Sequence, residues 1–160
     1  MSKVGRADLL NKKFKVNQIR NAIYAYIDIL GIDKNKKPEE IIKLLKEMGR
    51  KIALTYSNYW KPEFKNSLDL MREIHRTVFK TAARVRQNDS EISVISRSCP
   101  FCKYSRENIE VPGHFILLGF IETLYELISK ENSSIPKIRG ISITSRISGD
   151  NKCEYNFKIV

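Results

Sequence analysis

The chain has 160 residues, 42% of them hydrophobic and 29% charged, which is the composition of an ordinary soluble globular domain. Its formal net charge of +11 is compatible with a nucleic-acid partner but does not favour one, because the basic residues form no long run and many lie beside Glu or Asp. No apolar stretch has the ~18–20 residues of a membrane span, and residues 1–11 lack the apolar core of a signal peptide. We therefore expect a cytoplasmic protein without a transmembrane segment.

The first part of the chain predicts two helices. Apolar residues recur every three or four positions over 14–30, which indicates an amphipathic helix that ends at Gly31, and residues 1–11 are expected to be flexible. A second helix is predicted from Pro38 to about Tyr56. Gly49 lies inside this helix at a cost of about 1 kcal/mol relative to Ala, which indicates close packing against another helix.

The next segment predicts a third helix and then a change to strands. Pro62 is expected to open the helix, and His75 has charged neighbours, which predicts a histidine on the surface. After Thr81 the hydrophobic period changes from 3.6 to 2. Alternating residues at 83–86 and 92–96, on either side of a turn, indicate a β-hairpin.

A fourth helix is predicted from His114 to Lys130. It is apolar on almost every side, so we expect it to be nearly enclosed at the centre of the fold. Its apolar residues exceed what one contact with a sheet would use. They could line a ligand pocket between helices and sheet, meet another subunit, or simply fill the core. The predicted pocket residues are Phe115, Leu118, Ile121 and Tyr125.

The C-terminal part predicts a second hairpin, with strands at 138–147 and 152–160 around a turn at 148–151. The final strand alternates cleanly, so Cys153 is expected to point into the core with Tyr155. One face of the first strand is predicted to hold Ile141, Ile143, Ser145 and Ile147.

The order of the predicted elements indicates an α+β fold, with an antiparallel sheet of about four strands and helices packed against it. We expect one domain over 1–160, with a helical part at 14–82 and the sheet and central helix at 83–160.

The three cysteines and one histidine suggest a metal site. Cys99 and Cys102 form a C-x-x-C motif that can direct two thiolates to one ion, and Cys153 and His114 are candidates for the third and fourth ligands. Such a Cys₃His set would hold a structural zinc ion. Two alternatives stay open. The C-x-x-C motif could be a dithiol redox pair, or Cys153 could be a small buried residue and His114 a helix-start residue.

No catalytic residue is assigned, because the chain has no nucleotide-binding glycine motif, Walker loop, H-E-x-x-H or G-x-S-x-G motif. An enzymatic activity is therefore not favoured.

Three segments together resemble a known family. They are C-P-F-C at 99–102, P-G-H-F-I-L-L-G-F-I-E at 112–122 and I-S-I-T-S-R-I-S-G-D-N-K-C-E-Y-N-F-K-I at 141–159. They resemble the 4-vinyl reductase domain family, in particular its archaeal hydrocarbon-binding proteins, and the resemblance covers about 45–160. This family is similar in fold to the subunits of TRAPP vesicle-tethering complexes and to sensor domains of aromatic-responsive bacterial regulators.

The resemblance implies a twisted antiparallel sheet with helices on one side, and a homodimer formed through N-terminal helices. It also implies an apolar small-molecule ligand, a hydrocarbon or lipid-like molecule, and zinc near the final hairpin. Zinc-holding members often carry a cysteine eight residues before the last one, where this chain has Ser145. Cys99 and Cys102 could take its place, and His114 lies near a further cysteine position of the related sensors.

We therefore predict a module that binds a hydrophobic small molecule and holds a structural zinc ion. Two alternatives remain. The family name implies a reductase acting on a vinyl-type substrate, although no nicotinamide or flavin fingerprint is present. The basic surface is compatible with a regulatory or nucleic-acid-linked sensor.

Overall fold

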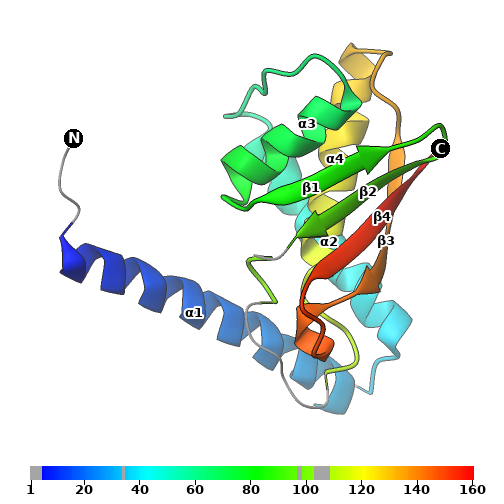
Figure 1. Ribbon diagram of the computed structural model, residues 1–160. Coiled ribbons are helices and arrows are strands. Elements are labelled where there is room, and N and C mark those ends of the chain that lie inside the picture. The colour runs from blue at the N-terminus through cyan, green and yellow to red at the C-terminus, as the bar shows by residue number, and fades with distance from the viewer. Residues whose placement is uncertain (1–4, 34, 97–98, 103–108) are drawn as a thin grey trace. The chain divides into compact units, whose positions relative to one another are not determined.

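The computed structural model describes residues 5–33, 35–96, 99–102 and 109–160 (Figure 1). By its internal contacts the chain separates into two compact units, Met1–Ile41 and Ile42–Val160, and each is described by itself. The single domain predicted over 1–160 stays a prediction. None of the described helices has the length and apolar content needed to cross a bilayer.

The first unit contains helix α1 (Arg6–Asp28) and a π-helical turn, η1 (Ile29–Asp33). The helix begins well before the predicted start at residue 14, so that start is wrong, whereas the flexibility expected of residues 1–11 stays a prediction. Two features favour the early start. Gly5 has the extended backbone of an N-cap, and Asp8 lies in the first turn, where a negative charge complements the helix dipole.

Burial in this unit follows the helical period. Tyr24, Ile27 and Leu30 are buried at spacings of three residues, whereas Ile19 and Tyr26 are exposed. One stripe of the helix is therefore covered, but it is not the expected apolar face throughout, because Ile19 and Tyr26 belong to that face and are exposed, while Tyr24 is buried.

The second unit contains most of helix α2 (Pro38–Tyr56), and helices α3 (Ser67–Glu73) and α4 (Phe115–Glu131). Helix α3 starts at Ser67 rather than at Pro62, so the predicted start is wrong. Asn66 caps the helix, because its side chain accepts a hydrogen bond from the Asp69 backbone N–H. The helix continues into a π-helical turn, η2 (Ile74–Val78).

Helices α2 and α4 pack backbone to backbone at two glycines. A Cβ atom added to Gly49 would lie 2.0 Å from the Ile116 carbonyl oxygen, and one added to Gly119 would lie 2.1 Å from the Lys46 carbonyl oxygen. The close packing predicted for Gly49 is therefore confirmed, and Gly119 is its counterpart on α4.

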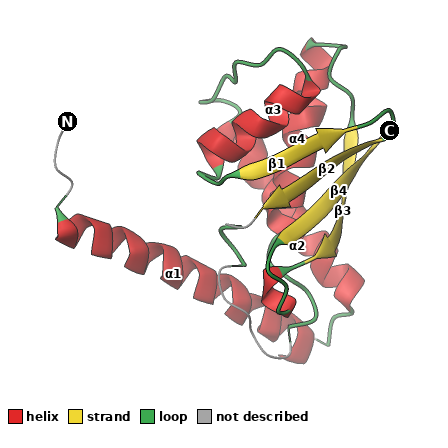
Figure 2. Ribbon diagram, in the orientation of Figure 1, coloured by secondary structure: helices red, strands yellow, loops and turns green. Residues whose placement is uncertain are grey.

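The four strands form one antiparallel sheet in the order β1-β2-β4-β3. The strands are β1 (Ala83–Gln87), β2 (Glu91–Ser96), β3 (Ile138–Thr144) and β4 (Cys153–Ile159). Helices α2 and α4 lie on the same face of this sheet (Figures 1 and 2). Helix α4 is nearly enclosed, with every residue from Ile116 to Ile121 buried. The predicted α+β architecture and the central position of this helix are confirmed.

The end of β3 differs from the prediction. The register shifts between Ser142 and Thr144, and the chain then forms a short 3₁₀ helix, η3 (Arg146–Ser148). Ser145 caps this helix, so the alternation expected up to residue 147 stops at the bulge. Ile141 is 56% exposed and does not face the core.

A partly buried ion pair connects α2, α4 and β3. The Lys46 ammonium lies 2.7 Å from Glu122 Oε1 and donates to the Gly140 carbonyl oxygen at 3.0 Å. Glu122 also accepts a hydrogen bond from the Gly140 N–H at 2.5 Å. This carboxylate therefore has a structural role at the edge of the helix–sheet contact.

Candidate functional site

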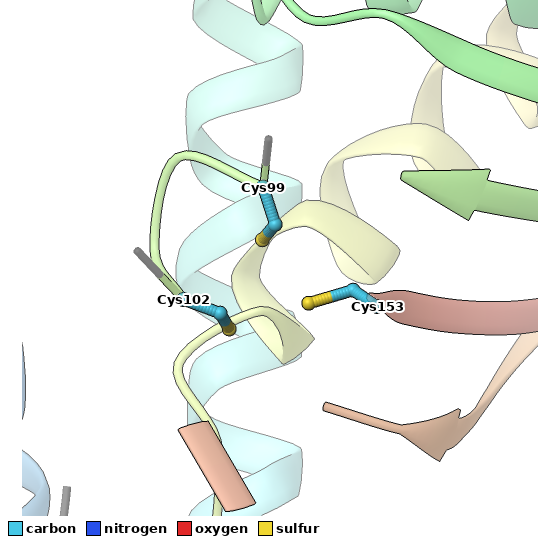
Figure 3. Close-up of side chains that lie close together, drawn as sticks. All are labelled: Cys99, Cys102 and Cys153. Carbon is cyan, nitrogen blue, oxygen red and sulfur yellow. The ribbon is translucent and has the colours of Figure 1, made fainter. Parts of the chain in front are cut away.

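The three cysteine sulfurs converge at one end of the sheet. All lie within 4.8 Å of one another, and their side chains point toward a common centre (Figure 3). Cys99, Cys102 and Cys153 are 3%, 0% and 0% exposed, and none forms a disulfide. Three adjacent thiols that are shielded from water make a donor set suited to a soft metal ion such as zinc.

The sheet and one tight turn bring these cysteines together. Cys99 and Cys102 follow β2, and the Cys102 N–H donates to the Cys99 carbonyl oxygen at 3.3 Å, which closes the turn between them. Cys153 is the first residue of β4 and faces inward. Because β2 pairs directly with β4, the end of one strand lies beside the start of the other. The inward direction predicted for Cys153 is confirmed.

His114 lies at the border of the cysteine cluster. It is 1% exposed, and its Nδ1 is 3.6 Å from the Cys102 sulfur. Its ring stacks on Phe115 and on Tyr155, with centroid distances of 5.1 and 6.2 Å. Burial lowers the pKa of His114 to about 4, so its ring is neutral near pH 7, which is the form that can bind a metal. Among the described histidine, cysteine and acidic residues, however, the group that meets the mutual 4.8 Å distance consists of the three cysteines alone.

The three thiols share one negative charge. Hydrogen bonds from the Cys102 and Cys99 thiols lower the pKa of Cys153 to about 2, and the Arg146 N–H adds to this effect. The hydrogen bond with Cys102, then that with Cys153 and burial, raise the pKa of Cys99 far above its usual value. The hydrogen bond with Cys153, together with burial, raises the pKa of Cys102 to about 11. The cluster therefore consists of one thiolate supported by two thiols, and a cation could replace the two protons.

Two groups of the final hairpin donate to the sulfurs. The Ser145 hydroxyl lies 3.4 Å from the Cys102 sulfur, and the Arg146 backbone N–H lies 3.5 Å from the Cys153 sulfur. Donors of this kind orient and stabilise metal-binding thiolates. Ser145, where the family resemblance implies a cysteine, therefore lies against the cluster as a hydrogen-bond donor.

A buried polar network adjoins the site, and the prediction that His75 lies on the surface is wrong. His75 is 2% exposed, and its two ring nitrogens lie 3.1 Å from Thr81 Oγ1 and 3.2 Å from the Tyr155 hydroxyl. The Tyr155 ring contacts the rings of both His75 and His114, with centroid distances of 6.2 Å in each case. The charged neighbours of His75 in sequence indicated the surface, whereas its environment includes Tyr155, which lies 80 positions away in the chain.

The four predicted pocket residues lie on the same helix but differ in exposure. Leu118, Ile121 and Tyr125 are 0% exposed, and the Tyr125 hydroxyl donates to the Ser67 carbonyl oxygen. Phe115 is half-buried. Their role in binding a ligand stays a prediction.

Two cavities among the described residues are lined by other side chains. The first has a volume of about 520 Å³ and lies between the α2–α3 connection and the C-terminal end of α4. Its apolar lining consists of Trp60, Pro62, Phe64, Leu124, Leu127 and Ile128, and its polar lining includes Lys61 and Lys130. The second, of about 570 Å³, lies at the final hairpin and is lined by Thr144, Asp150, Asn151 and Lys152. Sequence patterns gave no signal for the first cavity, because its walls come from a loop and a helix about sixty residues apart.

No protein-family model and no curated protein matches the chain in sequence. Among solved structures, a trafficking protein particle complex subunit 3 from Naegleria fowleri, covalently bound to palmitic acid, aligns with a TM-score of 0.67 and 15% identity. The alignment covers 92% of this chain and 96% of that chain. A vinyl-4-reductase family protein from Methanocaldococcus jannaschii aligns with a TM-score of 0.46 and 10% identity, over 100% of this chain and 99% of that chain. The first of these confirms the predicted TRAPP-subunit-like fold.

Proposed function

We propose that the chain is a small-molecule-binding module that takes a hydrophobic, hydrocarbon-like or lipid-like ligand and holds a structural zinc ion. The observation that carries the zinc part is the cluster of three buried sulfurs within 4.8 Å of one another. The ligand part is supported by the cavity on α4 and by the palmitic acid bound to the TRAPP subunit of the same fold.

The residues around the sulfurs fit a zinc ion. Thiolates are preferred zinc ligands, and the Ser145 and Arg146 donors support negative charge on Cys102 and Cys153. With His114 as the fourth ligand, all four donors would come from the protein. Such a closed set would give zinc a structural role, tying the loop after β2 to the final hairpin.

The cavity on α4 fits a hydrophobic ligand. Its volume of about 520 Å³ lies within the range of about 300–1,000 Å³ typical of ligand pockets, and six apolar or aromatic side chains line it. Lys61 and Lys130 at its border could pair with an acidic end group, such as a carboxylate. A longer chain could continue along α4 toward Ile121 and Leu118, the predicted pocket residues, if the side chains of the core moved apart.

The zinc part predicts one zinc ion per chain in purified protein, measured by native mass spectrometry under conditions that keep metals bound. Cys153→Ser should lose the ion, because two sulfurs and one histidine would remain to hold it. Ser67→Ala is the matched control, since this serine is buried in α3 and should leave the zinc content unchanged. Wild-type protein without metal after growth in zinc-supplemented medium would contradict this part.

The ligand part predicts that the cavity binds a fatty acid, and a fluorescent fatty acid displaced by palmitate is a direct probe. Leu127→Trp should fill the cavity and weaken binding at least tenfold, because the larger side chain occupies the apolar space. Ile141→Trp is the control, since Ile141 is 56% exposed on β3, outside the described lining. If Leu118→Trp rather than Leu127→Trp abolishes binding in a folded protein, the ligand lies instead among the predicted pocket residues.

A homodimer through the N-terminal helices is part of the proposal. Apolar side chains on the exposed stripe of the first unit support it, namely Ile19, Tyr26 and Ile29, which are 59%, 40% and 45% exposed. The mass of the native particle reports the oligomeric state in the same spectra. A cytoplasmic location remains part of the proposal as well.

A further inference from the structure

A second hydroxyl lies beside the cysteine cluster, at Ser96. It is the last residue of β2 and pairs directly with Cys153, the first residue of β4. Directly paired residues of antiparallel strands point to the same face, with Cβ atoms ~4.5–5.5 Å apart. Both residues face inward, because Ser96 is 1% exposed and Cys153 is 0% exposed. The Ser96 side chain is therefore the cross-strand neighbour of the Cys153 side chain.

The Ser96 hydroxyl has no hydrogen-bond partner among the residues that the structure describes. A buried hydroxyl without a partner destabilises a fold, and alanine would fill the position without this cost. The position thus holds a hydrogen-bond donor to which none of the described residues offers an acceptor.

A metal ion in the cluster would give the Cys153 sulfur a use for a further donor. The Arg146 backbone N–H lies 3.5 Å from this sulfur, and the Cys99 and Cys102 sulfurs lie within 4.8 Å of it. Cysteine binds metals as a thiolate, so each of the three sulfurs would carry negative charge at a metal ion. A nearby hydrogen-bond donor stabilises such a thiolate.

We propose that, once a metal ion occupies the cysteine cluster, the Ser96 hydroxyl donates a hydrogen bond to the Cys153 sulfur and acts as a positioning residue of the metal site. This inference rests on the proposed zinc site and adds an outer donor to it. Ser145 donates to the Cys102 sulfur, and the Arg146 backbone N–H donates to the Cys153 sulfur from the final hairpin. Ser96 would donate to the Cys153 sulfur from the neighbouring strand β2.

The inference predicts effects of opposite sign in Ser96→Ala. The metal-free variant should melt at the same temperature as the metal-free wild type or higher, because an unpartnered hydroxyl is removed. Its zinc affinity, measured by competition with a chromophoric chelator, should be about tenfold weaker or more, as is typical when an outer donor is lost. With cobalt in place of zinc, the sulfur-to-metal charge-transfer band should shift, because the thiolate loses a hydrogen bond.

Two variants serve as controls. Ser67 is 5% exposed, and its hydroxyl also lacks a partner among the described residues. Ser67→Ala should therefore match the metal-free behaviour of Ser96→Ala and keep wild-type metal affinity. Ser96→Thr keeps a hydroxyl and should bind zinc more tightly than Ser96→Ala.

The outcomes separate this inference from the zinc site itself. Wild-type zinc affinity and an unshifted cobalt band in Ser96→Ala would overturn the role of Ser96 and leave the zinc site standing. A wild-type protein that binds neither zinc nor cobalt would overturn both. Weakened binding in Ser96→Ala, with a shifted band and a metal-free protein at least as stable as wild type, would support the hydrogen bond.

Discussion

Alanine in place of Gly119 is expected to destabilise the protein by about 3 kcal/mol or more, the upper range for overpacking a core. The new Cβ would lie 2.1, 2.6 and 2.7 Å from the carbonyl oxygen, Cα and carbonyl carbon of Lys46. These are backbone atoms of α2, so relief requires α2 and α4 to separate. Urea unfolding followed by circular dichroism measures the change. A decrease in stability would be informative, because alanine normally stabilises an exposed helix by about 1 kcal/mol relative to glycine, so helix propensity alone predicts the opposite sign.

Substitutions at two other glycines test whether the close contact between α2 and α4 causes the loss of stability. Gly49→Ala should behave like Gly119→Ala, since its Cβ would lie 2.0 Å from the Ile116 carbonyl oxygen. Gly31→Ala should have little effect, because the nearest atom to its Cβ would be a side-chain carbon of Ile41 at 3.8 Å. A Gly119→Ala protein as stable as wild type would show that the helices do not approach this closely. If Gly119→Ala does not accumulate in soluble form while Gly31→Ala does, the loss is caused by the α2–α4 contact and not by the change from glycine to alanine as such.

The metal-free protein should lose stability between about pH 6.5 and pH 4, and His75 should account for about 3 kcal/mol of the loss. Burial lowers the pKa of His75 from 6.5 to about 4. The unfolded chain therefore takes up a proton below about pH 6.5, whereas the folded protein resists protonation until about pH 4. The difference of about 2.5 pH units corresponds to about 3 kcal/mol at ~1.4 kcal/mol per unit. The contribution of His75 to the free energy of unfolding is complete above about pH 6.5 and is lost as the pH falls to about 4.

His75→Gln isolates this contribution. A glutamine can still bond to the Tyr155 hydroxyl and does not titrate, so the variant should be less stable at pH 7 but should lose less stability on acidification. His114, whose pKa burial also lowers to about 4, titrates in the same range in both proteins and cancels in the comparison. Chemical unfolding at several pH values in the presence of a chelator measures both curves. If the free energy of unfolding falls equally with pH in both proteins, the pKa of His75 is not lowered in the folded protein and the prediction is wrong.

Much of the fold could be predicted because it depends on local periodicity. The change of period from 3.6 to 2 located the first hairpin, and the apolar surface of α4 placed it at the centre. The errors occur where local signals conflict with capping or distant contacts. Pro62 resembled a first-turn residue, but Asn66 provides the cap of α3, and the bulge after Ser142 ends the alternation of β3.

The candidate site was predicted to different extents for its different residues. Cys99 and Cys102 have a spacing typical of metal ligands, and the alternation of β4 fixed the direction of Cys153. The positions of His75 and Ser96 depend on the pairing of strands and helices far apart in the chain. His75 and Tyr155 are 80 positions apart, and the charged neighbours of His75 predicted the wrong environment. The role of His114 as fourth ligand of the proposed zinc site stays a prediction.

The strand order has a consequence for how the protein is made. Strand β4 lies between β2 and β3 in the sheet, although it follows both in the chain. A growing chain that has left the ribosome only as far as β3 has one finished hairpin and a strand without its neighbour. The sulfur of Cys153 reaches those of Cys99 and Cys102 only when β4 inserts between β2 and β3. Contacts so distant in sequence form slowly, so chaperones that protect unpaired strand edges would act on this chain until β4 has joined the sheet.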